Sequence, residues 1–434
     1  MQLPDKIVDL TQLFYKDETN SILTVFWNSL YIAFFLLPLG INLSTPFFII
    51  AIVVGLIHTF KTKNNFVLRN KVLLLFPLYF LLMVISLLYT ENIQDGLQLI
   101  QRSLTLLLFP IIFLFVKEDA STVKRLFNFL LYGLILSFFI NFGLTVYDIF
   151  NSKFKPLNKA GIFDTIFSTL DFVIKDWSQF TGNNFSRLIN PNYTSLYIVL
   201  VLSYFLKKTL SSTSRTGINI LLFLYLFLLS SKVAYAMLFI ISILFILSIT
   251  DKIKKNMAII ILLLGSIIFL NNPRIFEFYS RVKNFENQED ISAVNTEKSR
   301  VLSWDTSLRL IKEAPLLGYG VGDANDVLIH KYKELGYSEN YQNRYNAHNQ
   351  FLQTLLQTGL LGFSILAAIF IILGSRMNRS RNEFAVFLIL LIAISFESML
   401  VRFNGIVFFS VITPLLLKKR SILSSRIIRN TKTA

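Results

Sequence analysis

The chain has no cysteine among its 434 residues, and it has only three histidines. The absence of cysteine excludes a disulfide framework, a cysteine-based metal site and a thiol nucleophile. No two of His58, His330 and His348 have the spacing of a zinc site, so we expect neither a metal nor a cofactor. Acidic residues are also few, 26 against 42 Lys and Arg, and the formal net charge is +16. A strongly basic chain can indicate nucleic-acid binding, and the placement of the charges must decide this.

Apolar residues are abundant. They make up 54% of the chain, 43 of them are Phe, and the mean hydropathy is +0.58. This composition predicts an all-α polytopic membrane protein, with residues 1–434 forming a single integral membrane domain. The apolar runs are long enough for about twelve transmembrane helices. We place them near residues 22–40, 44–60, 72–90, 98–116, 125–149, 191–206, 217–231, 233–250, 256–271, 350–374, 383–400 and 403–417.

Lys and Arg are concentrated in alternate connections between these runs. The positive-inside rule then places both termini and the basic connections in the cytoplasm, which accounts for the charge without nucleic acid. Two long connections, 150–190 and 272–349, face outward under this count. The basic segments are Lys61–Lys71, Lys117–Arg125, Lys207–Arg215, Lys252–Lys255, Arg376–Arg381 and the tail from Lys418.

The two outer loops are longer than a connection requires, and long structured loops usually carry function. The second loop, 272–349, contains a predicted helix over 297–313 that ends before Pro315. Arg300 and Trp304 lie on one face of that helix. In the first loop, the amphipathic stretch 162–177 is typical of a segment lying on the membrane surface.

The second loop ends at the mouth of an apolar helix that begins near Phe351. Asn349, Gln353 and Gln357 recur every four residues and form one polar line along it. Unpaired amides in hydrocarbon are costly, so this line should face other helices or a wet cavity. His348 lies at the water-side end. An isolated histidine is often structural, but here the context favours a general base acting on a hydroxyl.

Several cations lie on the predicted outer side. Any one of them could reach the lipid headgroups or pair with a carboxylate, as Arg402 could with Glu397. Lys232 breaks the positive-inside pattern and has no acidic neighbour in sequence, so it should meet an anion in space. Arg300, Lys232 and Arg187 are therefore candidates to bind a diphosphate.

The glycine-rich segment Gly318–Asn325 resembles a nucleotide-binding loop only superficially. It follows a helix rather than a strand, and it lacks the Lys-Ser/Thr pair of a P-loop. We interpret it as a close-packed turn in which Gly320 and its neighbours supply backbone freedom. Gly359 and Gly362 are interpreted as permitting close helix packing.

Four ordered motifs resemble the signature of the O-antigen ligase/polymerase family. They are Arg300-x3-Trp304, Pro315-Leu316-Leu317-Gly318-Tyr319-Gly320-x-Gly322, His348-Asn349-x2-Leu352-Gln353 and Gly359-Leu360-Leu361-Gly362. Asn190-Pro191-Asn192 and Ser230-Ser231-Lys232 also resemble the family, although many members have Arg where this chain has Lys232. Together these motifs cover roughly residues 180–375.

The resemblance implies a metal-independent, inverting glycosyl transfer on the outer face of the bacterial inner membrane, with no cofactor. The implied donor is a glycan on undecaprenyl diphosphate, and the implied acceptor is lipid A–core or a growing glycan. His348 would activate the acceptor hydroxyl, and Arg300 and Lys232 would hold the diphosphate. Asn349, Asn192, Trp304, Gln353 and Gly320 would support the site.

An O-antigen ligase is our leading hypothesis from the sequence. A polymerase of the same family shares the motifs and is the main alternative. Transfer of glycan to a protein hydroxyl, or flipping of a lipid-linked glycan, are further alternatives. A transporter is expected to bury charges along a path through several spans, whereas the distinctive polar residues here cluster in outer loops and helix mouths. No Asp/Glu pair resembles that of a glycosidase, which favours transfer over hydrolysis.

Overall fold

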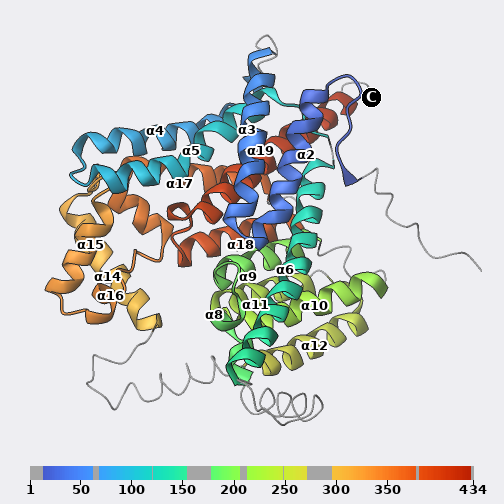
Figure 1. Cartoon of the computed structure of the whole chain (residues 1–434). Helices are drawn as coiled ribbons and strands as arrows, with labels where there is room; N and C mark the ends of the chain where they lie inside the picture. The colour runs from blue at the N-terminus through green and yellow to red at the C-terminus, as the bar shows by residue number, and fades with distance from the viewer. Residues whose placement is uncertain are drawn as a thin grey trace, which may run out of the picture. The chain divides into compact units, whose positions relative to one another are not determined.

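The computed structural model describes residues 13–61, 68–119, 121–153, 177–205, 213–247, 249–270, 296–377 and 381–431. Within these ranges every regular element is an α-helix or a 3-10 helix, which confirms the all-helical prediction (Figure 1). The stretch expected to be amphipathic, 162–177, lies almost wholly outside the described residues, and residues 272–295 of the loop 272–349 also lie outside them.

Each predicted apolar run contains a helix. In chain order the elements are α2 (Ser21–Leu36), η1 (Leu37–Leu39), α3 (Ile41–Lys61), η3 (Leu68–Leu74), α4 (Leu75–Ile85), η4 (Ser86–Tyr89), α5 (Ile93–Phe115), α6 (Thr122–Lys153), η5 (Trp177–Phe180), α8 (Gly182–Phe185), α9 (Pro191–Tyr204), α10 (Thr213–Leu229), α11 (Lys232–Ile246), α12 (Lys252–Leu270), α14 (Thr296–Glu313), α15 (Ala324–Glu334), α16 (Ser338–Gln342), α17 (Gln350–Met377), α18 (Arg381–Phe396), η7 (Met399–Val401) and α19 (Phe403–Thr431).

Six helical segments of the described residues are long and apolar enough to cross a membrane. Four further apolar helices are shorter, so the count of about twelve spans stays a prediction. The six are Ser21–Leu39, Ile41–Lys61, Asn70–Tyr89, Ile93–Phe115, Thr122–Ile149 and Gln350–Met377.

The chain forms two compact units. Unit 1 comprises residues 1–33, 45–126 and 289–434, and it contains α4, α5 and α14–α19 with most of α2 and α3. Unit 2 comprises residues 34–44 and 127–288, and it contains α8–α12 with most of α6. Each unit therefore draws its helices from separate parts of the chain.

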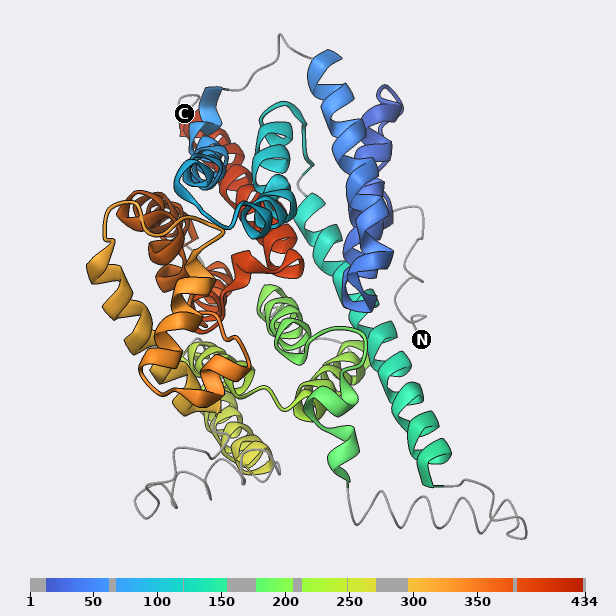
Figure 2. The same ribbon diagram turned by 60° about the vertical axis from the view of Figure 1, so that its left-hand side comes forward.

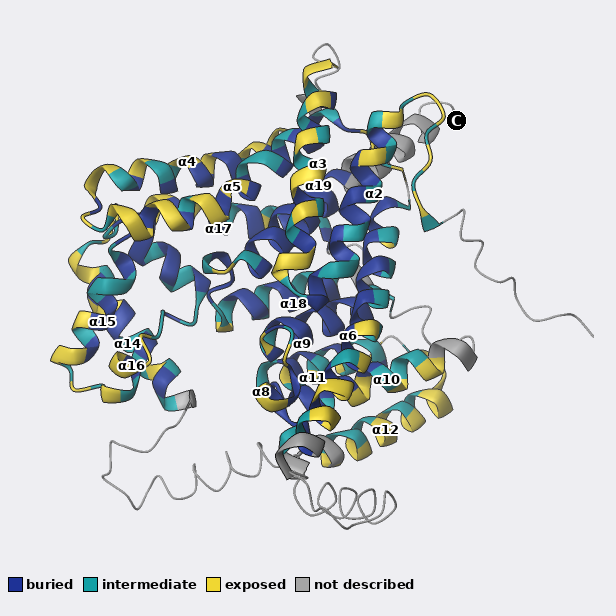
Figure 3. Ribbon diagram, viewed as in Figure 1, coloured by how far each residue is buried: buried dark blue, intermediate teal, exposed yellow. Residues whose placement is uncertain are grey.

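In unit 1, α4 packs against both α5 and α17, and α19 packs against α5. Aromatic rings fill the interior: Trp27 stacks on Phe113, and Phe370 stacks on Phe409. The outer faces of α3, α4 and α5 carry exposed apolar side chains such as Leu78 (Figure 3). Apolar side chains that face outward suit contact with lipid.

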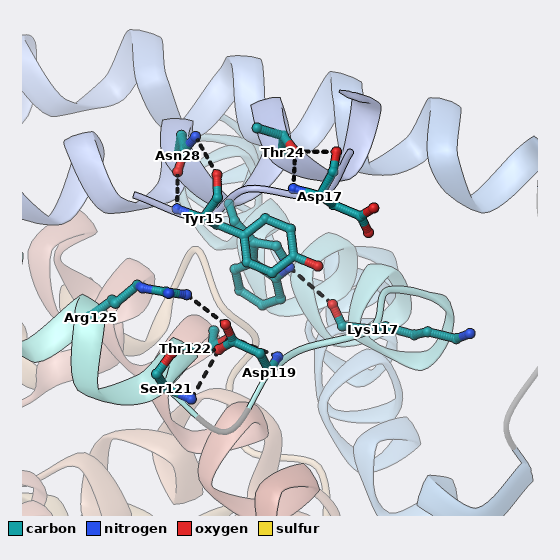
Figure 4. Close-up of polar contacts among 10 residues, drawn as sticks. Tyr15, Asp17, Thr24, Asn28, Lys117, Asp119, Ser121, Thr122 and Arg125 are labelled. Carbon is teal, nitrogen blue, oxygen red and sulfur yellow. Dashed lines mark hydrogen bonds and ion pairs between the residues drawn. The ribbon is translucent and has the colours of Figure 1, made fainter. Parts of the chain in front are cut away.

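Polar contacts join α2 to the connection between α5 and α6, and a cluster around Asp119 holds that connection (Figure 4). Trp27 Nε1 donates to the carbonyl oxygen of Lys117 at 3.0 Å. The carboxylate of Asp119 accepts from the backbone N–H of Ser121 at 2.9 Å and pairs with Arg125 at 2.6 Å. The Asp119 carboxylate thus accepts from an N–H group just before α6 and pairs with Arg125 in the first turn of α6, which holds the connection in one conformation.

The predicted helix 297–313 is present as α14, Thr296–Glu313. Helices α14, α15 and α16 lie together, and α14 and α15 pack against α17; Figure 2 shows the three helices in orange. A small apolar core joins them. Its buried members are Leu310, Ala324, Leu328, Tyr332, Ala347 and Leu356. Because Ala347 immediately precedes His348, this core places the histidine relative to α14.

The glycine-rich segment is a close-packed turn, as expected. A side chain on Gly320 would meet Thr90 Oγ1 at 2.0 Å, and one on Gly322 would meet the carbonyl oxygen of Asn92 at 2.1 Å. The Asp323 carboxylate accepts from the backbone N–H groups of Glu91 and Asn92 at 2.8 and 2.7 Å. Gly320 therefore supports the fold of this region, and its backbone is occupied by protein contacts.

We predict that Gly359→Ala destabilises the protein by about 1–3 kcal/mol, because its backbone conformation is one that glycine alone adopts readily. Gly359 has φ +59° within α17, and an added Cβ would lie 2.2 Å from the carbonyl oxygen of Leu316. Gly143→Ala in α6 is the matched control, since open space surrounds that position and alanine favours helix. The measurement is the midpoint of thermal unfolding in detergent, and equal midpoints for the two variants would contradict the assignment.

Candidate active site

Arg300 and Trp304 lie one turn apart on α14. The indole of Trp304 packs against Phe396 with ring centroids 5.7 Å apart. The buried amide of Asn340 donates to the carbonyl oxygen of Ser299 at 2.7 Å and to Ser303 Oγ at 2.9 Å. These contacts hold α14 at both ends of the turn that carries Arg300.

His348 lies just before α17 in a left-handed backbone conformation with φ +46°. Its N–H donates to Asn346 Oδ1 at 2.9 Å, and the ring of Tyr345 packs edge-on against the imidazole at 5.3 Å. Asn349 caps α17 by accepting from the backbone N–H groups of Phe351 and Leu352 at 2.9 and 3.2 Å. The imidazole is thus held by its own loop, in a backbone state that costs energy.

Among the described residues other than glycine, three have positive φ: Ser230, Arg344 and His348. All three lie in or beside the predicted motifs. Residues held in sparsely populated backbone regions concentrate at functional sites. The strained backbone at these positions supports the prediction that the segments 230–232 and 344–349 are functional.

Arg300 and His348 meet at the carboxylate of Glu397, which follows the last residue of α18. Glu397 Oε2 lies 3.7 Å from Arg300 Nη2 and 3.8 Å from His348 Nδ1. The three side chains are 19%, 20% and 21% exposed for Arg300, Glu397 and His348. The predicted base and the predicted diphosphate ligand are therefore neighbours, in a place that solvent reaches.

Burial by itself would raise the pKa of Glu397, but the adjacent imidazole of His348 and the charges of Arg300 and Arg402 lower it below its ordinary value. The carboxylate is consequently ionised at neutral pH. Two guanidinium groups face one carboxylate, so the cluster keeps excess positive charge suited to an anionic ligand. In the part of the chain that the structure describes, no three His, Asp or Glu side chains are grouped to hold a metal ion.

The polar line on α17 was expected to face other helices or a wet cavity, and its two inner residues, Gln353 and Gln357, are buried in protein. Gln353 is buried, donates to Asn325 Oδ1 at 3.1 Å and accepts from the backbone N–H of Ala347 at 3.2 Å. Gln357 is also buried. Gln353 therefore holds the loop that ends in His348 rather than facing a substrate.

Gln350 was not singled out from the sequence, yet it connects the two sides of the site. This buried side chain accepts from the backbone N–H of Leu400 at 2.7 Å and donates to Thr354 Oγ1 at 3.2 Å. Thr354 in turn shares a hydrogen bond with Tyr79 of α4 at 3.0 Å. The network fixes the segment that follows Glu397 to the start of α17.

Glu397 is the site residue that sequence reasoning missed, since it was considered only as a partner for Arg402. A signal was present. Glu397 is an acid inside the predicted span 383–400, and an ionisable residue within an apolar run is a functional candidate.

Unit 2 holds the other predicted site residues. Arg187 forms an ion pair with Asp148 of α6 at 2.6 Å, and its Nε donates to the carbonyl oxygen of Asn184 at 2.7 Å. Arg187 therefore pairs with a carboxylate, which the sequence analysis gave as the alternative to binding a diphosphate.

Asn192 and Lys232 lie close together within unit 2. Asn192 is in the first turn of α9, whose N-terminus is capped by Asn190. Ser231 Oγ donates to Asn192 Oδ1 at 3.2 Å, and Lys232 begins α11. The two family-like motifs of unit 2 therefore meet at the N-terminal ends of two helices.

Residues 217–367 match the model of a protein family described as O-antigen ligase. This segment contains Lys232, Arg300, the glycine-rich turn and His348, and it ends within α17. The resemblance seen in the sequence motifs is thereby confirmed. No curated protein matches the chain.

We predict that Glu397 makes stability depend on pH. Because its folded-state pKa lies below the ordinary value of 4.5, the ionised carboxylate stabilises the protein above that pH. This contribution disappears as the pH falls below 4.5 through the folded-state pKa. Glu397→Gln should lower stability at pH 7 by on the order of 1 kcal/mol, and the difference from wild type should vanish at low pH.

The measurement is the thermal midpoint of both proteins in detergent between pH 3.5 and pH 7. Glu18→Gln is the control, since that side chain is exposed. A difference between wild type and Glu397→Gln that stays constant over this pH range would contradict the charged role of Glu397.

Proposed function

We propose that this protein is an O-antigen ligase, because residues 217–367 match the model of a family described as O-antigen ligase. It would transfer a polysaccharide from undecaprenyl diphosphate to a lipid A–core acceptor, without a metal and with inversion at the sugar. The observation that carries the proposal is the meeting of His348 and Arg300 at one carboxylate, Glu397. A base and a phosphate ligand side by side are the minimum that such a transfer needs.

In this proposal His348 removes the proton from the acceptor hydroxyl. With Nδ1 facing Glu397, Nε2 is the nitrogen that accepts the proton. The acceptor oxygen bonds to the anomeric carbon while the bond from that carbon to the diphosphate oxygen breaks. Attack opposite the leaving group inverts the configuration. The negative charge of Glu397 stabilises the imidazolium that forms.

The leaving diphosphate keeps the bonding electron pair, and Arg300 is proposed to stabilise its charge. Lys232 and Arg187 are proposed as further phosphate ligands on the family resemblance. Lys232 is the stronger of these two, because Arg187 already pairs with Asp148. A lysine offers charge without the bidentate fork of an arginine, so its phosphate contact differs from that of Arg300.

The proposed location is the bacterial inner membrane, with both termini in the cytoplasm and the loops 150–190 and 272–349 in the periplasm. Six candidate spans and the alternation of Lys and Arg along the chain support this arrangement. Donor and acceptor are both lipid-linked, so the membrane would bring them to one enzyme. A polymerase that extends the lipid-linked glycan would use the same residues, and it is the second candidate.

Reconstitution distinguishes these activities. The purified protein in vesicles should convert radiolabelled undecaprenyl-diphosphate glycan and lipid A–core into a product that carries both. Longer lipid-linked chains without any need for lipid A–core would identify the polymerase instead. Labelled donor that is neither transferred nor lengthened would contradict both forms of the proposal.

Each of the two central residues has a control of the same residue type. His348→Ala should lower the transfer rate by about 10²–10⁴-fold, as expected for the loss of a general base. His330→Ala should have no effect, since His330 is 79% exposed on α15. Arg300→Ala should lower the rate at least about tenfold, whereas Arg309→Ala should not, because Arg309 is exposed on α14 and pairs with Asp305. Equal effects within either pair would remove the corresponding assignment.

A further inference from the structure

Three side-chain nitrogens at the site are covered from solvent and have no hydrogen-bond partner: Arg300 Nε and Trp304 Nε1, both on α14, and His348 Nδ1 beside Glu397. The first two can only donate. A buried donor without a partner costs on the order of 1–3 kcal/mol, so nearly all such groups are paired in folded proteins. Two obligatory donors left unpaired on residues one turn apart, Arg300 and Trp304, indicate that their acceptor arrives with a ligand.

The two donors are presented together by the helix. Residues four apart lie on one face of an α-helix, with side chains about 5–6 Å apart at Cβ. Packing of the indole against Phe396 holds Trp304 in place. The guanidinium of Arg300 approaches Glu397 through Nη2 at 3.7 Å, which is longer than a hydrogen bond, and its Nε has no hydrogen-bond partner. The position beside Nε is therefore not taken by that carboxylate.

The remaining fully described tryptophan shows how this fold satisfies an indole whose role is structural. Trp27 is buried, stacks on Phe113, and its Nε1 donates to the carbonyl oxygen of Lys117 at 3.0 Å. Trp304 has a comparable aromatic contact but lacks the acceptor. The contrast sets Trp304 apart from a residue that only fills space.

We propose that Arg300 Nε–H and Trp304 Nε1–H bind one anionic oxygen of the lipid-linked diphosphate, which makes Trp304 a donor-binding residue. The inference rests on the proposed function. An indole N–H donates and cannot accept, so the ligand must supply the acceptor. The neighbouring guanidinium selects an anion, and hydrogen bonds to a charged group are stronger than those between neutral groups. On binding, the diphosphate oxygen replaces Glu397 at Arg300 and leaves the carboxylate to His348.

The test compares Trp304→Phe with Trp27→Phe in the purified full-length protein. Trp304→Phe keeps a ring against Phe396 and removes only the donor. It should weaken binding of undecaprenyl diphosphate and of inorganic pyrophosphate by about tenfold. It should raise KM for the donor more than it lowers kcat, without lowering the thermal midpoint, because the donor that is removed has no partner in the protein. Trp27→Phe should lower the thermal midpoint and leave both dissociation constants at the wild-type value.

A double-mutant cycle tests whether one oxygen is shared. Arg300→Lys keeps the charge and removes the Nε donor in its fixed geometry. If both donors hold the same oxygen, the double variant should have a dissociation constant little higher than that of the single variant that binds more weakly. If the loss of affinity in the double variant equals the product of the two single losses, the donors make separate contacts, and the proposal of one shared oxygen is wrong.

The outcomes separate this inference from the proposed function. Transfer by the wild-type protein together with unchanged diphosphate binding by Trp304→Phe would overturn the role of Trp304 and leave the function intact. Weakened binding in Trp304→Phe without any transfer by the wild type would support the diphosphate contact and contradict the ligase. Weakening confined to the lipid form, with pyrophosphate unaffected, would place the indole against the lipid chain and overturn the proposal.

Discussion

One carboxylate oxygen, Glu397 Oε2, lies between a guanidinium and an imidazole that come from different parts of the chain. A carboxylate largely withdrawn from water is stable as an anion only when opposite charge compensates the lost hydration. Arg300, His348 and Arg402 supply that compensation. Helix α14, the start of α17 and the end of α18 must therefore stay together for the charges to balance, and the rest of unit 1 serves to keep them so.

The scaffold around this contact is built from buried amides. Asn340 fixes α14, Gln353 fixes the loop before α17, and Gln350 fixes the segment after α18. Each amide is hydrogen-bonded to the backbone of another segment. Because hydrogen bonds are directional, the network fixes the orientation of these segments as well as their separation. Apolar packing around Ala347 and the glycine-rich turn add the close contacts that leave little freedom of movement. Such rigidity can sustain a strained backbone at His348.

This arrangement suits a reaction whose energy resides in the donor. A diphosphate leaving group needs its charge stabilised, and an incoming hydroxyl needs a base. Unit 1 places a cation and a histidine on either side of one acid, and two unpaired donors extend the cationic side along α14. Unit 2 holds Lys232 at the start of α11 beside Asn192, in the second region where motif and backbone strain coincide.

The helical elements and the local motifs were predictable from the sequence. Apolar periodicity located the helices, including α14 within one residue of its expected start, and the glycines marked the close-packed turn. The four-residue spacing of Gln353 and Gln357 correctly placed their side chains against protein. These features follow from interactions between residues that are near in sequence, or from the environment that one face of a helix must have. The number of membrane spans is less determined, because helices such as α9, with 14 residues, are short for a bilayer.

Only the tertiary structure decided which side chains meet. Glu397 joins Arg300 and His348 across 97 and 49 residues of chain, and Gln350 reaches Leu400 across 50. Arg187 was one of three similar candidate cations until packing placed Asp148 beside it. Helical spacing specifies the face on which a residue lies, but the group opposite that face depends on how distant helices pack.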